Sequence, residues 1–195
     1  MNDLLLRPLR KSGLIHDVTP KSAHWGYVGM AIHLLSAGEE ISGLTDEKEI
    51  IMVIVEGKCT IKVDDIDFGV LGNRMSVFER LSPHSIYAPM NSNWSCKATT
   101  DCTIAICSAP GKGNYKTKLL DRPILTRRGK DNNTRYINNI AMEQHDVADS
   151  LLVTEVFTPQ GNWSSYPPHR HDEDNYPNIT YLEETYYHRL NPPQG

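Results

Sequence analysis

The sequence predicts an all-β protein, and three observations lead to that fold class. Between residues 27 and 109, short apolar runs recur at near-regular spacing, and β-branched residues are abundant in them. Gly, Asn and Pro separate the runs, and helical periodicity is weak throughout this region. Such spacing is typical of a β-sandwich or a β-barrel.

The individual strands can be placed from the same pattern. The first is expected within YVGMAIHLLSAG at 27–38. The run EIIMVIVEGKCTIKVDD at 49–65 is expected to form two strands joined by a turn at Glu56-Gly57-Lys58. Further strands are expected in SVFERLS, SIYAP, WSCKATTD and CTIAICSAPG, at residues 76–82, 85–89, 94–101 and 102–111.

The composition changes after Gly111 and divides the chain into two β units. Residues 1–111 are expected to form an N-terminal barrel, and the polar, Lys- and Arg-rich residues 112–135 a solvated linker. Strand-like runs return in 136–195, which is expected to be the start of a second barrel. A barrel needs more strands than this unit supplies, so we expect it to be incomplete, as a fragment or with borrowed strands.

Bulk properties exclude several classes of partner. The 195 residues carry a net charge of −4, and no basic excess indicates a nucleic-acid partner. No apolar run is long enough to span a membrane, and the N-terminus lacks the order of a signal peptide. A cytoplasmic protein is therefore expected. The four cysteines, at 59, 96, 102 and 107, show no CxxC pair, so we interpret them as reduced thiols of a β core.

The segment NWSSYPPHRHDEDNYPNITYLEETYYHR, at 162–189, carries the candidate site. In an extended strand, residues i and i+2 face the same side. His169 and His171 would then converge on one face, with Arg170 pointing away. A His-x-His pair alone also occurs as two exposed polar residues on a strand, and the acidic loop 172–175 is expected to be solvated.

The following Glu-rich run favours a metal site over that simpler interpretation. If Glu184 faces inward, Tyr186 and His188 share its face, and Glu183 and Tyr187 lie opposite. Two neutral imidazoles and one carboxylate suit zinc, manganese or iron(II). Arg189 has the wrong parity to bind a substrate in such a pocket.

The run TPQGNWSSYPPHRHD followed by TYLEETYYHRLNPPQG, at 158–172 and 180–195, closely resembles the 5-deoxy-glucuronate isomerase family of myo-inositol catabolism. Relatives of that family include the uronate ketol-isomerases of pectin breakdown. Supporting resemblance comes from LGNRMSVFE, YAP, CSAPG and RRGKDNN, at 71–79, 87–89, 107–111 and 127–133.

This resemblance implies a bicupin, with two double-stranded β-helix (jelly-roll) barrels. The first barrel would lack metal ligands, and the second would hold a divalent metal ion, zinc or manganese. His169, His171 and Glu184 match the family's first three ligands, with Glu183 as the alternative if the register differs by one residue. The family's fourth ligand, a histidine, is expected beyond Gly195.

The activity implied by the resemblance is the isomerisation of 5-deoxy-glucuronate to 5-dehydro-2-deoxy-gluconate. His188, Tyr186 and Glu183 are the candidates for moving the proton. The partner would be this small sugar acid, and exposed edge strands would favour a homo-oligomer. Two alternatives stay open: a non-haem iron cupin oxygenase, and a non-catalytic sugar-binding cupin.

Overall fold

The structure, a computed structural model, describes residues 4–9, 11–120 and 124–193 and confirms the all-β fold class. The main sheet and its branches comprise β1 (Gly13–Val18), β2 (Gly29–Leu35), β3 (Glu40–Leu44), β4 (Lys48–Val63), β5 (Ile66–Arg74), β6 (Ser85–Ala88), β7 (Asn93–Ala98), β8 (Cys102–Pro110) and β9 (Lys118–Leu120). A second sheet comprises β10 (Thr126–Arg128), β11 (Arg135–Ala141) and β12 (Val153–Phe157). The helices are single turns: α1 (Pro20–Ala23), η1 (Val77–Glu79), η2 (Asp131–Asn133) and η3 (Glu143–His145).

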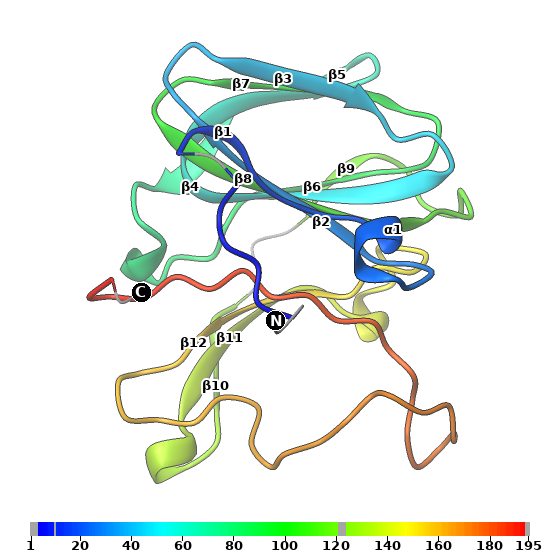
Figure 1. Ribbon diagram of the computed structural model, residues 1–195. Helices are drawn as coiled ribbons and strands as arrows, with labels where there is room; N and C mark the ends of the chain where they lie inside the picture. Colours follow the sequence, from blue (N-terminus) through cyan, green and yellow to red (C-terminus); the bar gives the residue numbers. More distant parts are fainter. Residues whose placement is uncertain (1–3, 10, 121–123, 194–195) are drawn as a thin grey trace.

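Strand β4 joins the two layers of the first unit. Its first half pairs with β6 and β8, and its second half pairs with β5 and β7, which in turn pairs with β3. Figure 1 shows β3, β5 and β7 as a layer above β1, β2, β4, β6 and β8.

The turn predicted at Glu56-Gly57-Lys58 is wrong, because β4 continues through it. The pairing register shifts there instead, and Gly57 has a φ of +84°. A Cβ at Gly57 would lie 2.2 Å from the Asp101 carbonyl oxygen, so only glycine fits this bend.

The apolar residues of β4 fill two separate cores. Ile50, Met52 and Ile54 belong to the core between the two layers of the first unit, together with the free thiols of Cys59, Cys96 and Cys102. The alternate residues Ile51, Val53 and Val55 belong to a second core on the opposite face. A strand buried on both faces reads as an unbroken apolar run, which is the pattern the sequence shows. The prediction of reduced core thiols is confirmed for these three cysteines.

The second core lies between the main sheet and the three-stranded sheet β10–β11–β12. Ile140 and Leu151 are buried in it, and Phe157 and Tyr187 pack against it. Figure 1 shows the smaller sheet below the larger one. The predicted linker 112–135 carries two of the strands, since β9 pairs with β6 and β10 pairs with β11. The two barrel domains themselves stay a prediction.

The strand predicted at 76–82 is wrong, because this run contains the 3-10 turn η1. The Ser76 side chain accepts from a backbone amide of the turn, and the Glu79 carboxylate accepts from the Ser76 amide at 2.9 Å. This reciprocal capping box favours a helical turn over an extended strand.

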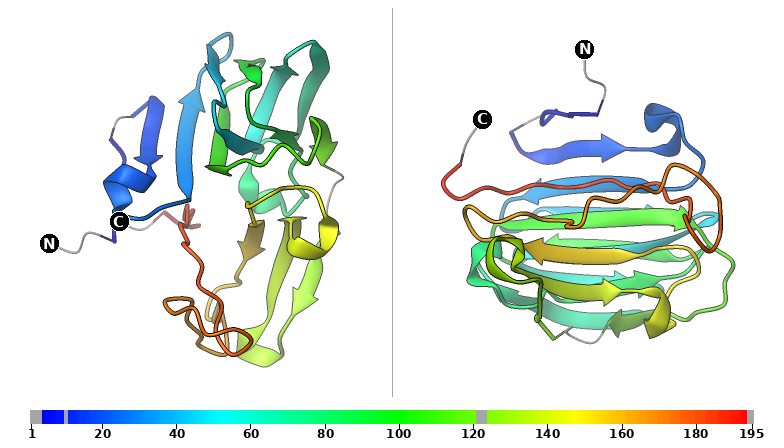
Figure 2. Two further views of the ribbon diagram at one scale, coloured as in Figure 1. Left: turned by 90° about the vertical axis from the view of Figure 1, so that its right-hand side faces the viewer. Right: turned by 90° about the horizontal axis from the view of Figure 1, so that it is seen from below.

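The strands predicted around His169 and Glu184 are also wrong: after Phe157, no strand occurs in the described part of the chain. A strand requires hydrogen bonding to a neighbouring strand. Residues 180–189 instead run extended beside β1 and β2 (Figures 1 and 2), and their side chains make the contacts with the first unit. No helix in the described ranges has the length and apolarity to cross a membrane.

Candidate functional site

The two predicted histidine ligands lie together. The ring centroids of His169 and His171 are 5.2 Å apart, with the planes at 83°. The Nδ1 atom of His169 is 3.1 Å from the Pro167 carbonyl oxygen, and the Nδ1 of His171 is 2.9 Å from the Thr180 carbonyl oxygen. A carbonyl only accepts, so in each ring we assign the proton to Nδ1, which leaves the Nε2 lone pair as a metal donor.

Glu184, Tyr186 and His188 lie on one side of their extended segment. The Tyr186 hydroxyl donates to Glu184 Oε2 at 2.8 Å. The rings of Tyr186 and His188 stack at 5.9 Å between centroids and 14° between planes. These three residues are exposed, whereas the intervening Thr185 and Tyr187 are half-buried. The predicted alternation is therefore present, although the strand is not. The predicted inward direction of Glu184, Tyr186 and His188 is wrong, because these three side chains are exposed and the opposite face of the segment is the packed one.

The Tyr186 phenol is held in its protonated form. Partial burial and the hydrogen bond to the neighbouring Glu184 carboxylate raise the pKa of Tyr186 to about 12. At neutral pH this side chain can donate a proton or a hydrogen bond, and it cannot serve as a base.

Glu183 and Tyr187 face the first unit. The Glu183 carboxylate accepts from the backbone amides of Gly26, Tyr27 and Val28 at 2.7, 2.7 and 2.9 Å. Desolvation raises the pKa of Glu183, but these three amides outweigh it and hold the pKa below its ordinary value. The Tyr187 ring meets the His16 ring edge-on at 5.8 Å.

The structure does not bring the three predicted ligands together. In the described ranges, no group of three or more His, Cys, Asp or Glu side chains is arranged to hold a metal ion. The histidine pair and the Glu184 segment are connected by a hydrogen bond of 3.0 Å from the Leu182 amide to the His171 carbonyl oxygen. The donor chemistry of the two imidazoles fits a divalent metal, and the third donor stays a prediction.

The two arginines of the segment are both paired with acids. Arg170 forms salt bridges with Asp172 at 3.6 Å and with Glu173 at 3.1 Å, in an exposed loop. Arg189 donates to Glu56 at 2.7 Å. The Arg189 guanidinium is directed at the first unit, opposite to Glu184, in agreement with the parity predicted for it.

Sequence reasoning missed two acids that join the units, the buried Glu49 and the half-buried Glu155. Glu49 is fully buried and accepts four hydrogen bonds, one from the Tyr87 hydroxyl and three from the amides of residues 149–151. Glu155 pairs with the buried Arg74 at 2.5 Å. Glu49 opens the apolar run of β4, where a lone carboxylate could have indicated a buried partner. Nothing in the sequence indicates that Arg74 and Glu155 form a pair, because 81 residues separate them.

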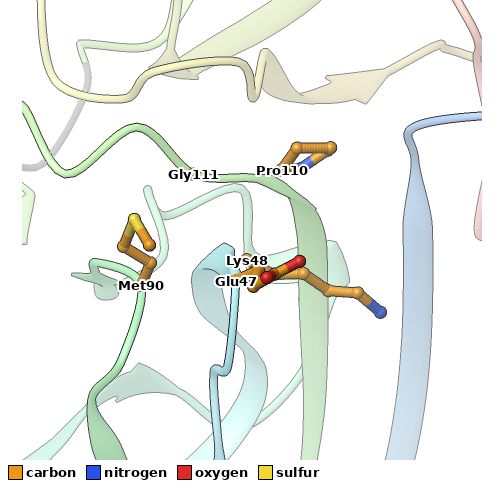
Figure 3. A pocket seen from close by; sticks show the side chains of 5 residues that line it. All are labelled: Glu47, Lys48, Met90, Pro110 and Gly111. Carbon is orange, nitrogen blue, oxygen red and sulfur yellow. The ribbon is translucent and has the colours of Figure 1, made fainter.

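A hollow of about 370 Å³ lies elsewhere on the first unit, lined by Glu47, Lys48, Met90, Pro110 and Gly111. Figure 3 shows these residues around the ends of β4 and β8. None of the predicted site residues lines it.

Comparison with known proteins decides the family. The sequence profile of the KduI/IolB family matches residues 4–195. The chain belongs to the KduI/IolB family. Membership in the KduI/IolB family confirms the resemblance drawn from the motifs at 158–172 and 180–195.

Family members of similar sequence carry one name. A protein named 5-deoxy-glucuronate isomerase from Geobacillus kaustophilus is 44% identical over 187 residues, covering 95% of this chain and 67% of the relative. A protein of the same name from Halalkalibacterium halodurans is 42% identical, covering 100% of this chain and 75% of the relative. The chain thus spans about two thirds to three quarters of these relatives' length.

A solved structure of an IolB-like protein has the same fold. The crystal structure of an IolB-like protein from Salmonella typhimurium LT2 superposes with a TM-score of 0.94 at 43% identity. The match covers 98% of this chain and 73% of that one. The arrangement of the two sheets is therefore shared with an experimental structure.

Proposed function

We propose that this protein is a metal-dependent isomerase that converts 5-deoxy-glucuronate to 5-dehydro-2-deoxy-gluconate. Relatives named for this substrate, 44% identical over nearly the whole chain, support the assignment. Fold alone would not, because barrels of this kind carry many chemistries. The metal dependence in this proposal is supported by the imidazole pair of His169 and His171, each of which has its Nδ1 atom at a carbonyl oxygen.

In this proposal, His169 and His171 bind a divalent ion, zinc or manganese, through Nε2, and Glu184 supplies the carboxylate. Such an ion, when bound, supplies Lewis-acid stabilisation of the charge that develops on the substrate oxygens. The Pro167 and Thr180 carbonyls orient the two rings by accepting from Nδ1, so that Nε2 is the ring nitrogen available to a metal. The Tyr186 hydroxyl orients the Glu184 carboxylate through its hydrogen bond.

The reaction moves a proton between neighbouring carbons, and the chain offers two groups for that step. A base removes the proton beside the aldehyde, and an acid returns one to the former aldehyde carbon, so that an aldehyde becomes a ketone without a redox cofactor. His188 is the proposed base, since an imidazole ring nitrogen can accept a proton and return it. Tyr186 is stacked on His188 and protonated at neutral pH. Its one hydroxyl proton is donated to Glu184 in the structure, and in this proposal it turns from Glu184 to the substrate oxygen when the substrate binds. Such acid–base help is worth roughly 10²–10⁴-fold.

Two further parts of the proposal concern partners and location. We propose a cytoplasmic enzyme whose partner is its sugar acid. We also propose self-association through β5, which in the described part of the chain pairs only with β4.

The test combines metal content with turnover. The purified protein is analysed for bound metal by mass spectrometry, and loss of the aldehyde proton of 5-deoxy-glucuronate is followed by NMR. His169→Ala and Glu184→Ala are expected to lose both metal and turnover. The exposed His145 and Glu143 provide matched controls, and their alanine variants should keep both properties.

If His169→Ala and Glu184→Ala retain metal and turnover, the site is wrongly assigned. Oxygen uptake dependent on ferrous iron would support an oxygenase instead. Sugar binding without turnover would support a non-catalytic cupin.

A further inference from the structure

Two adjacent acids, Glu183 and Glu184, occupy opposite sides of the same extended segment. Glu183 faces the first unit, and Glu184 lies on the exposed side with Tyr186. A shift of one residue would exchange the two carboxylates. Something must therefore fix the register of this segment.

Backbone pairing does not provide that register, because residues 180–189 form no strand. Side chains at three alternate positions hold the segment against the first unit instead. Glu183 binds the loop before β2, Tyr187 packs on His16 of β1, and Arg189 bonds Glu56 of β4. All three anchors lie on odd-numbered residues, whereas the even-numbered Glu184, Tyr186 and His188 are exposed. Figure 2 shows the backbone of this segment passing along the first unit.

Among these anchors, Glu183 makes the most directional contact. Three consecutive amides, those of Gly26, Tyr27 and Val28, converge on its two oxygens. Consecutive backbone amides of this kind form an anion-binding concavity, and hydrogen bonds to a charged acceptor are about twice as strong as neutral ones. A hydroxyl or an amide side chain would not satisfy three donors in the same way.

We propose that the loop 26–28 selects Glu183 and thereby presents Glu184 as the metal-side carboxylate. In this proposal, Glu183 is a positioning residue. The amides of the first unit hold its carboxylate, and Glu183 acts by fixing the direction of Glu184. The metal part of this inference rests on the proposed function, whereas the register part stands on the contacts alone.

The test uses Glu183→Ala and the gentler Glu183→Gln, with the exposed acid Asp174→Ala as the matched control. Register is measured without metal or substrate, by amide hydrogen exchange at residues 26–28 and by the NOE between the His16 and Tyr187 rings. Metal affinity is measured separately, by titrating zinc against a chelator of known affinity. Thermal unfolding shows that each variant is folded.

Glu183→Ala is expected to speed exchange at Gly26, Tyr27 and Val28, and to weaken the ring NOE. Zinc affinity should fall by about 10- to 100-fold, the range seen when groups that orient metal ligands are removed. Glu183→Gln should fall between the wild type and Glu183→Ala, and Asp174→Ala should match the wild type.

Two results would overturn the inference. An unchanged ring NOE in Glu183→Ala would show that the register does not depend on Glu183. Faster amide exchange at residues 26–28 in Glu183→Ala, with unchanged zinc affinity, would show that Glu183 only stabilises the contact and does not position Glu184. If the wild type itself binds no zinc, the proposed function fails, and the exchange and NOE data still decide the register claim.

Discussion

The buried carboxylate of Glu49 gives the sharpest test of how the two units are held together. Its Oε2 accepts from the Tyr87 hydroxyl at 3.0 Å and from the Asp149 amide at 2.7 Å. Its Oε1 accepts from the amides of Ser150 and Leu151 at 2.7 and 2.8 Å. Burial, with the neighbouring Glu49 carboxylate, raises the pKa of the Tyr87 phenol, so that this group remains a donor.

Replacing Glu49 by alanine removes the acceptor from all four donors. Tyr87 and Leu151 are buried, so their hydroxyl and amide cannot turn to water. A buried donor without a partner costs about 1–3 kcal/mol. The expected loss of unfolding free energy for Glu49→Ala is therefore about 2–6 kcal/mol, because the half-buried Asp149 and exposed Ser150 can bind water. That corresponds to a fall in Tm on the order of 10 °C for a chain of this length.

Urea unfolding followed by circular dichroism measures this loss. The exposed Glu47, two residues away on the same chain, is the matched control, and Glu47→Ala should cost at most about 0.5 kcal/mol. The double variant Tyr87→Phe with Glu49→Ala should lose less unfolding free energy than the two single variants added together, because both substitutions remove the same hydrogen bond. A loss below about 1 kcal/mol for Glu49→Ala, at unchanged denaturant slope, would refute the reasoning.

Two further predictions concern charged pairs at the same junction. Arg74→Met should lower the free energy of unfolding, measured in urea, by about 3–5 kcal/mol, because it leaves Glu155 at the junction without its charged partner. Adding Glu155→Leu should recover part of this loss. The prediction is contradicted if the double variant loses as much unfolding free energy as the two single variants added together. Desolvation raises the pKa of Glu56, but hydrogen bonds led by that of Arg189 lower it overall, below its ordinary 4.5. The stabilisation from Glu56 is thus complete above the unfolded-state pKa and lost as pH falls through the folded-state pKa, so Glu56→Gln should flatten the acid limb of a stability–pH profile.

Local chemistry explains what the sequence could predict. The alternation of Glu183, Glu184 and Tyr186 follows from extended geometry alone, so their faces were predictable without knowing any partner. The double burial of β4 was visible as an unbroken apolar run. The predicted turn at Gly57 failed because glycine serves equally in a turn and in a strand bend, and only the nearby Asp101 carbonyl decides between them.

Long-range pairing explains what the sequence could not predict. Glu183 meets its partners at residues 26–28, and Glu49 meets its partners at 149–151. No periodicity connects positions that far apart along the chain. The predicted strands at 169–189 failed for the same reason, since a strand exists only where a neighbour supplies its hydrogen bonds.

The direction of these long-range contacts bears on how the two units relate. Glu49 belongs to the first unit and binds amides of the second, whereas Glu183 belongs to the second and binds amides of the first. Arg74 and Glu155 cross the same junction as a charged pair. Because each unit supplies acceptors for the other's backbone, separating them would break charge-assisted hydrogen bonds on both sides. The first unit, whose core between its two layers is apolar and holds no predicted ligand, thus acts as the scaffold on which the glutamate-bearing segment is held.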